Sequence, residues 1–227
     1  MSPGEAALTL RALPLFKGLP ERRLKLLEQG ATVRAYAAGE TILDERPAAG
    51  GLYVLLSGRA KLFRLWPDGR EQILYFFGPG EPFCLCSMYE GRRAPANAAA
   101  VEASRVLVLE GRAFEAMARQ EPAILFDILR VVSRRLKEAM DLVESLSFRE
   151  IPGRVAMYLT HAEAAARDPD RIRLPLTHRE LAKVVGASPE ALSRAFRRLA
   201  DDGLLTVKGR DVRILDRARL EAVAAGE

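Results

Sequence analysis

The hydrophobic positions follow a different period in each of three successive regions of the chain. Residues 8–28 carry leucines at helical spacing, with a break at Gly18-Leu19-Pro20. Between about residues 32 and 110, short apolar runs alternate with glycine turns at a spacing of roughly 8–12 residues, which favours an antiparallel roll or barrel. Residues 112–148 contain no glycine and return to helical spacing. The pattern therefore predicts short helices, a β-rich domain and a long helix, in that order.

The predicted strands of the β-rich region end at residues that favour turns. In Pro67-Asp68-Gly69 the proline fixes φ, the aspartate can bond back to the backbone, and the glycine can adopt a positive φ. The pattern contains no parallel β-α-β unit. The strands are expected at residues 41–43, 52–56, 60–66, 72–77, 83–88, 96–101 and 105–109.

The long helix after Pro122 repeats an apolar residue in alternating steps of three and four. Over roughly two and a half heptads this is the seam of a two-stranded coiled coil, and polar residues such as Arg134 and Glu138 flank it. The alternative is an amphipathic helix that packs on its own domain. We expect a dimer helix whose interface residues are Leu129, Val132, Leu136, Ala139, Val143 and Leu146.

The start and stop signals of two short helices follow one another near the C-terminus. Thr177 and Glu180 have the spacing of a capping box, and Gly186 suits the position just after a helix end. Ser188-Pro189 then resembles a second N-cap with proline at the first helical position. A short helix, a glycine turn and a second helix make a helix-turn-helix.

Charge supports a nucleic-acid partner for this region. The chain carries 35 Lys and Arg against 30 Asp and Glu, a net charge of +5. Residues 171–213 hold ten basic and five acidic residues, so this stretch accounts for the whole excess. A basic helix-turn-helix is typical of duplex DNA binding, and the alternative is a domain used for protein contacts. Runs at 204–207 and 212–215 predict a hairpin beside the two helices, a wing.

Taken together, these features resemble the Crp/Fnr family of bacterial transcription regulators, nearly from end to end. The glycine signals that match the family are Gly39-Glu40, Ser57-Gly58, Asp68-Gly69-Arg70-Glu71 and Gly78-x-Gly80-Glu81. The resemblance implies an α+β fold with a β-roll sensor domain, similar to cyclic-nucleotide-binding domains, at residues 1–118. A dimerisation helix at 119–148 and a winged helix-turn-helix at 149–227 follow. The resemblance also implies RNA polymerase as a partner.

The second helix of the motif would read the DNA sequence. Glu190-Ala191-Leu192-Ser193-Arg194 matches the Glu-x-x-Ser-Arg pattern of the Fnr branch, which implies inverted half-sites of the TTGAT type. Arg194 can donate two hydrogen bonds to guanine, and Glu190 can accept a hydrogen bond from a cytosine amine. The cyclic-AMP branch carries an arginine where Pro189 stands. Candidate base contacts are Ser188, Pro189, Glu190, Ser193 and Arg194. Candidate phosphate contacts, each of which could also be a solvated side chain, are Thr177, His178, Arg197, Lys208 and Arg210.

The sensor domain holds the chain's only two cysteines, Cys84 and Cys86. On a strand they would share one face. They could be small buried apolar residues, thiol redox sensors or, for Cys84, a ligand of haem iron. The haem hypothesis rests on a resemblance of residues 83–87 to the carbon-monoxide-sensing branch, and the overall layout also resembles the nitric-oxide-responsive branch.

Two other effectors of the family are not expected. Where the cyclic-AMP branch has its Gly-Glu and Arg-Ser pairs, this chain has Cys84-Leu85 and Pro95-Ala96, so the phosphate and ribose would lack charged partners. The N-terminal region has no cysteine for an iron-sulfur cluster. A roll that senses no effector and serves only as a dimer scaffold remains a further alternative.

Other functional classes lack support in the sequence. There is no Ser/His/Asp set, P-loop, dinucleotide fingerprint or metal-ligand cluster, so an enzyme is not expected. No apolar run approaches the about 18 residues of a membrane span, and the N-terminus does not resemble a secretory signal. Two cysteines fit a reducing compartment. We therefore expect a cytoplasmic, homodimeric regulator that binds double-stranded DNA and does not contact membranes.

Overall fold

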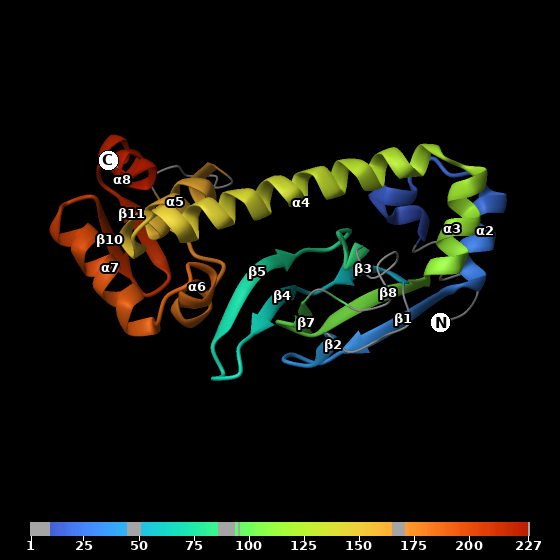
Figure 1. Ribbon diagram of the computed structural model, residues 1–227, viewed down its shortest axis with the longest axis horizontal. Helices are drawn as coiled ribbons and strands as arrows, with labels where there is room; N and C mark the ends of the chain where they lie inside the picture. Colours follow the sequence, from blue (N-terminus) through green and yellow to red (C-terminus); the bar gives the residue numbers. More distant parts are fainter. Residues whose placement is uncertain (1–9, 45–50, 86–93, 95, 165–170, 227) are drawn as a thin grey trace. The chain divides into compact units, whose positions relative to one another are not determined.

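The structure is a computed structural model of the chain, and it describes residues 10–44, 51–85, 94, 96–164 and 171–226 (Figure 1). The chain forms two compact units. The first contains the described residues up to Arg70 and those from Leu74 to Lys137. The second contains Glu71–Ile73 and the residues from Glu138 onward. Within the described ranges, no helix combines the length and the apolar character that crossing a membrane requires.

Two antiparallel four-stranded sheets, which lie in the first unit except for Glu71–Ile73 of one strand, confirm the predicted β-roll. One sheet has the order β1-β8-β3-β6, formed by Ala31–Tyr36, Ser104–Glu110, Gly51–Ser57 and Pro82–Phe83. The other has the order β2-β7-β4-β5, formed by Thr41–Leu43, Asn97–Ala100, Ala60–Leu65 and Glu71–Phe77. Side chains on β3 alternate between two apolar clusters. Leu52 and Val54 pack with the helical cluster, and Tyr53 and Leu55 pack in the roll cluster, which explains why consecutive residues 52–55 are all apolar.

Helical segments among the described residues complete this unit. They include η1 (Pro14–Phe16), α2 (Glu21–Gln29), α3 (Gly111–Gln120) and the N-terminal part of α4 (Ala123–Phe148). Their apolar side chains, among them Phe16, Leu27 and Phe114, form the helical cluster with β3 and β8. The long helix predicted from the sequence is confirmed, and it begins directly after Pro122.

The strand predicted at residues 83–88 is wrong at residues 84 and 85, and residues 86–88 lie outside the described residues. The observed strand β6 ends at Phe83, because Cys84 adopts a φ of 56°, in the left-handed region that an extended strand cannot contain. The idea that Cys84 and Cys86 share a face of one strand therefore fails. Cys86 itself lies outside the described residues.

The second unit is a winged helix-turn-helix. It contains the end of α4, α5 (Ile151–Ala164), α6 (His178–Val184), α7 (Pro189–Asp201) and α8 (Arg217–Ala225). A three-stranded antiparallel sheet has the order β10-β11-β9, formed by Leu205–Lys208, Asp211–Ile214 and Arg171–Arg173. The predicted hairpin is confirmed, whereas the third strand, β9, was not predicted. Helix α5 begins at Ile151, after a two-residue connection from the end of α4.

Candidate nucleic-acid interface

The predicted caps position the two helices of the motif. The Thr177 hydroxyl accepts from the Glu180 backbone N–H at 3.2 Å, and the Glu180 carboxylate accepts from the Thr177 backbone N–H at 2.8 Å. This reciprocal pair is the predicted capping box. The Ser188 hydroxyl accepts from the Ala191 N–H at 3.2 Å and begins α7, with Pro189 at the first helical position. Because the Thr177 hydroxyl also donates to Glu180 at 2.8 Å, the structure favours a capping role for it.

The turn between α6 and α7 requires a residue without a side chain. Gly186 has a φ of 64°, and a Cβ atom there would lie 2.8 Å from Leu146 and 3.3 Å from Arg154. Arg154 of α5 donates to the carbonyl oxygens of Val185 at 3.0 Å and of Leu146 at 3.3 Å. No sequence motif marked Arg154, yet it joins the turn to the end of α4.

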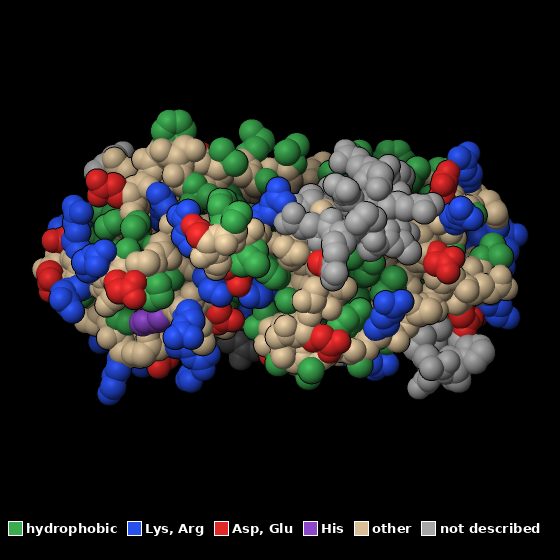
Figure 2. Space-filling view, turned by 60° about the horizontal axis from the view of Figure 1, so that its bottom comes forward, with side chains coloured by type: hydrophobic (Ala, Val, Ile, Leu, Met, Phe, Trp, Pro, Cys, Tyr) green, Lys and Arg blue, Asp and Glu red, His purple; other side chains and the backbone are tan. Residues whose placement is uncertain are grey.

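Helix α7 separates its residues into a buried and an exposed face. Leu192, Ala195, Phe196 and Leu199 are buried and hold the helix against its unit. The candidate base contacts Ser188, Pro189, Glu190, Ser193 and Arg194 are all exposed, as is Arg197. In Figure 2, Lys and Arg side chains stand at the surface of the second unit, with acidic side chains between them. The structure thus brings the predicted reading residues together on one helix face.

Glu190 is held in its ionised form at neutral pH. Hydrogen bonds from its own backbone N–H and from Ser188 lower the pKa of its carboxyl group, and the positive charge of Arg194 acts in the same direction. Residues 190 and 194 are one turn apart and therefore lie on the same helix face. This face of α7 therefore presents the Glu190 carboxylate, a hydrogen-bond acceptor, beside the Arg194 guanidinium, which can donate two hydrogen bonds.

His178 is placed differently from the other candidates for phosphate contact. Its ring is half-buried and stacks on Phe196 at 5.2 Å between centroids, so it packs α6 against α7. Within the described residues its buried Nε2 has no hydrogen-bond partner. Lys208 and Arg210 are exposed at the hairpin turn, where Gly209 has a φ of 60°.

Helix α4 exposes an apolar stripe. Leu129, Val132, Leu136 and Val143, four of the six predicted seam residues, are exposed large apolar side chains. Ala139 is also exposed, whereas Leu146 is half-buried next to Gly186. Sequence reasoning missed Phe126 and Met140, both 64% exposed. Each lies three residues before a predicted seam residue, and this helical spacing could have added both residues to the predicted seam. The large apolar side chains of the α4 stripe are Phe126, Leu129, Val132, Leu136, Met140 and Val143.

Within the roll, Cys84 is buried among aromatic rings. It belongs to the roll cluster with Tyr53, Phe77 and Phe83, and the Phe77 and Phe83 rings stack at 4.8 Å. Glu81, three residues before Cys84, accepts from the Gly78 N–H at 2.8 Å and from Arg135 of α4 at 3.1 Å. The guanidinium of Arg135 also lies 3.4 Å from the centroid of the Tyr75 ring. The end of β5 and the first half of α4 are therefore linked by charge.

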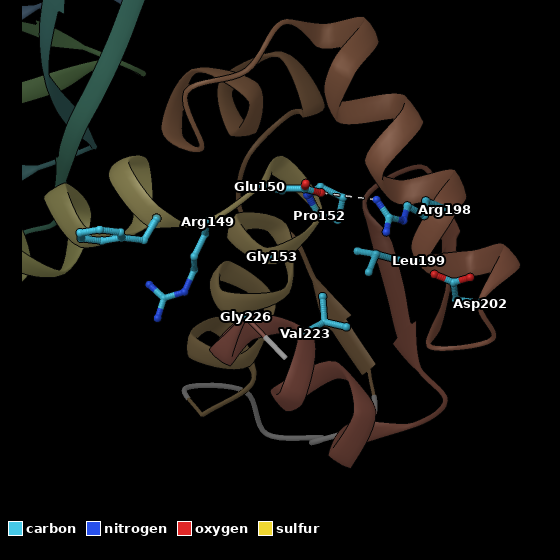
Figure 3. A pocket seen from close by; sticks show the side chains of 10 residues that line it. Arg149, Glu150, Pro152, Gly153, Arg198, Leu199, Asp202, Val223 and Gly226 are labelled. Carbon is cyan, nitrogen blue, oxygen red and sulfur yellow. Dashed lines mark ion pairs between the residues drawn. The ribbon is translucent and has the colours of Figure 1, made fainter.

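A hollow of about 290 Å³ lies between the start of α5 and the ends of α7 and α8 (Figure 3). Two arginines at the hollow have partners within the unit. Arg198 pairs with Glu150 at 3.5 Å, and Arg149 pairs with Glu144 at 2.8 Å and donates to the Ala224 carbonyl. Leu199 and Val223 are among the other residues that line it. These contacts tie α5, α7 and α8 together behind the exposed face of α7.

Comparisons with known proteins match both units. Residues 33–121 match the cyclic nucleotide-binding domain, and residues 153–223 match the Crp-like helix-turn-helix domain. The chain is 31% identical to the cyclic AMP receptor protein of Thermus thermophilus, over 96% of this chain and 99% of that protein. It is 27% identical to the transcriptional activator protein Anr of Pseudomonas aeruginosa, over 86% of this chain and 81% of that protein.

Solved structures have the same fold. The structure of FixK2 from Bradyrhizobium japonicum superposes with a TM-score of 0.71 at 25% identity, over 85% of this chain and 96% of that one. A CooA mutant from Carboxydothermus hydrogenoformans superposes with a TM-score of 0.76 at 20% identity, over 86% and 88% of the two chains, and shows the fold alone. The Pseudomonas relative is named a transcriptional activator. The chain therefore belongs to the Crp/Fnr family of DNA-binding transcription regulators.

Proposed function

We propose that this regulator acts as a homodimer on inverted half-sites of the TTGAT type. The observation that carries the proposal is the exposed face of α7, on which ionised Glu190 and Arg194 lie one turn apart beside Ser193. The Glu190 carboxylate can accept a hydrogen bond from a cytosine amine, and the Arg194 guanidinium can donate two hydrogen bonds to guanine. Together on one face, they suit the recognition of base-pair edges in the major groove. Exposed Arg197, Lys208 and Arg210 supply positive charge for phosphates around it.

The exposed stripe of α4 supports the dimer. Leu136 and Met140 are 61% and 64% exposed, and a row of such side chains in water is unfavourable unless another surface covers it. The three- and four-residue spacing suits a second copy of the same helix. A dimer would present two α7 helices, which an inverted repeat with half-sites about one helical turn apart requires.

DNA binding is tested with two duplexes of equal length. One carries two inverted TTGAT-type half-sites and the other has the same bases scrambled. We expect the inverted repeat to bind at least about 1,000-fold more tightly at fixed salt, with two chains on each duplex by sedimentation. Equal affinity for both duplexes, or one chain on each duplex, contradicts the proposal.

For the signal, the cyclic nucleotide named for the Thermus relative does not fit this chain. Leu85 stands at the position that would supply the ribose carboxylate, and it packs against the helical cluster. Pro95, at the position of the phosphate arginine, has no charge. The two polar ends of a cyclic nucleotide would thus face uncharged side chains. We expect no change in DNA affinity when cyclic AMP is added.

Cys84 is the residue on which we base the signal hypothesis. Its thiol is buried in the apolar cluster that also contains Tyr53, Phe77 and Phe83, and a cysteine thiolate can act as the axial ligand of haem iron. A thiol redox sensor and a roll without effector are the competing hypotheses. RNA polymerase is the proposed partner in transcription.

An absorption spectrum of the protein expressed with excess haem separates these three hypotheses. A Soret band that shifts with carbon monoxide or nitric oxide and is lost in Cys84→Ala supports haem. A colourless protein whose DNA affinity depends on reductant supports the redox sensor. A colourless protein that binds DNA equally with and without reductant supports the scaffold.

A further inference from the structure

The hollow between α5, α7 and α8 combines apolar walls with charged side chains (Figure 3). Pro152 of α5, Leu199 of α7 and Val223 of α8 are among its apolar lining residues. Its volume of about 290 Å³ is close to the lower end of the roughly 300–1,000 Å³ that ligand pockets enclose. Every lining residue belongs to the second unit. The hollow is therefore a candidate site for a small molecule, contained within one unit.

The charges at the hollow do not balance within the unit. Arg149 pairs with Glu144 at 2.8 Å, so its charge is compensated by a residue outside the lining. Arg198 pairs with Glu150 at 3.5 Å, and both side chains are mostly exposed. The carboxylate of Asp202, which also lines the hollow, forms no ion pair or hydrogen bond with any residue that the structure describes. With two carboxylates and one further arginine, the hollow has an excess of one negative charge.

The helix ends at the hollow add to this negative charge. Asp202 and Gly226 are the C-terminal caps of α7 and α8, and the C-terminal end of a helix dipole is negative. The dipole of α5 has its positive end at Ile151, but Glu150 directly precedes that end and supplies a carboxylate. A carboxylate at the C-terminal end of α7 is unfavourable by itself, because the negative end of the dipole repels it. The surroundings of Asp202 therefore favour a cation.

We propose that the hollow binds a small organic cation, a primary ammonium group on a short apolar chain. In Figure 3, Leu199 stands between Asp202 and Val223. An ammonium group that pairs with Asp202 can therefore extend its chain over Leu199 toward Val223. A metal ion would leave this apolar wall in contact with water, and an anion would be repelled by Asp202. The proposal goes beyond DNA binding, because it adds a separate ligand site to the unit that carries α7.

The test titrates the full-length protein with n-butylammonium chloride in a calorimeter at constant ionic strength. Ammonium chloride offers the charge without the chain, n-butanol offers the chain without the charge, and calcium chloride tests for a metal site. A capped lysine carries the same ammonium group and chain on a peptide backbone, for which the small hollow leaves no room. We expect n-butylammonium to bind with a Kd of about 1 mM, within the limit for a ligand of this size, and more tightly than each other compound.

Variants on both sides of the charge balance locate the ammonium group. Asp202→Asn should weaken binding about fivefold, because the unpaired carboxylate is lost. Asp201→Asn removes the same charge from the neighbouring residue, which is outside the lining, and should keep the wild-type Kd. Arg198→Gln should tighten binding about threefold, because it removes a cation and releases Glu150 from its ion pair. Arg213→Gln removes an exposed arginine elsewhere in the same unit and is the control for net charge.

Any of the following results would overturn the inference. Ammonium chloride or n-butanol could bind as tightly as n-butylammonium, so that charge and chain are not recognised together. The capped lysine or calcium could bind more tightly, which would assign the hollow to a protein side chain or to a metal. Asp202→Asn could bind like the wild type, or Arg198→Gln could bind more weakly. If thermal melting shows that Asp202→Asn does not fold, the gain expected in Arg198→Gln still decides the question.

Discussion

The Arg154 guanidinium donates a hydrogen bond to the backbone carbonyl of Val185 at 3.0 Å. The same side chain donates to the carbonyls of Arg149 at 2.9 Å and Leu146 at 3.3 Å. Carbonyls at helix ends have no donor within their own helix, and these three lie at the ends of α6 and α4. One side chain of α5 therefore fastens the turn before α7 to the end of the long helix.

Replacement of Arg154 by alanine should lower the free energy of unfolding by about 1–3 kcal/mol, because several carbonyls lose a charged donor. Affinity for the inverted repeat should fall with it, since α7 loses its support. Arg154→Lys should recover only part of the stability and of the DNA affinity, because an ammonium group cannot reach several carbonyls at once as the planar guanidinium does. Arg219→Ala, which removes a bond to the Asp202 carbonyl, is the control. Thermal melting and gel-shift titration measure the two effects, and wild-type values in Arg154→Ala would refute the role.

Removal of the Arg194 side chain should cost about 1–3 kcal/mol of binding to the inverted repeat. The loss on a scrambled duplex should be smaller, because a base contact adds nothing there. Arg198→Ala is the matched control, since Arg198 is exposed on the same helix but pairs with Glu150. Anisotropy titrations with both duplexes measure the difference. An equal loss on both duplexes would show that Arg194 contacts only phosphates.

A charge in the middle of the α4 stripe should separate the two chains. Leu136→Glu is expected to sediment as a monomer and to bind the inverted repeat at least about 100-fold more weakly, because the second half-site no longer adds avidity. Leu26→Glu makes the same change at an exposed leucine of α2 and should leave the dimer intact. A dimeric Leu136→Glu protein would mean that the stripe is not the interface.

Loss of the capping hydroxyl in Thr177→Ala should destabilise the protein by about 1 kcal/mol. Thr177→Ser keeps the hydroxyl and should retain most of the stability. If Thr177 acts only as a cap, the salt dependence of DNA binding should be the same in all three proteins. A shallower slope of log K against log[salt] in Thr177→Ala would instead support a phosphate contact.

The roll should become less stable in alkaline solution, because the buried phenol of Tyr53 resists ionisation. Burial raises the pKa of this phenol above its ordinary value of 10.0, and the thiolate form of Cys84 adds to the shift. Above about pH 10 the unfolded chain loses this proton before the folded chain does, so the stabilisation present below pH 10 declines as the pH rises. Urea unfolding at about pH 9 and 10.5 should show a smaller decline in Tyr53→Phe. An identical decline in both proteins would argue against this cause.

Local signals in the sequence were sufficient for the helix-turn-helix. The caps at Thr177 and Ser188 and the turn at Gly186 were predicted, because each depends on hydrogen bonds and φ angles within a few residues. The α4 seam was found from spacing, but the same spacing allows two neighbouring registers. Only exposure in the folded unit added Met140 and Phe126 to the stripe.

The amino-acid order by itself determined the class of fold, the order of its main parts and the exposed helix face that we propose reads DNA. Tertiary structure decided what depends on distant residues. The strand after Phe83 stops because Cys84 turns into the left-handed region inside a packed cluster. Strand β9 is only three residues long, and it becomes visible through its pairing with β11. That pairing brings Arg171 opposite Arg213, residues 42 positions apart whose shared face no local pattern could reveal.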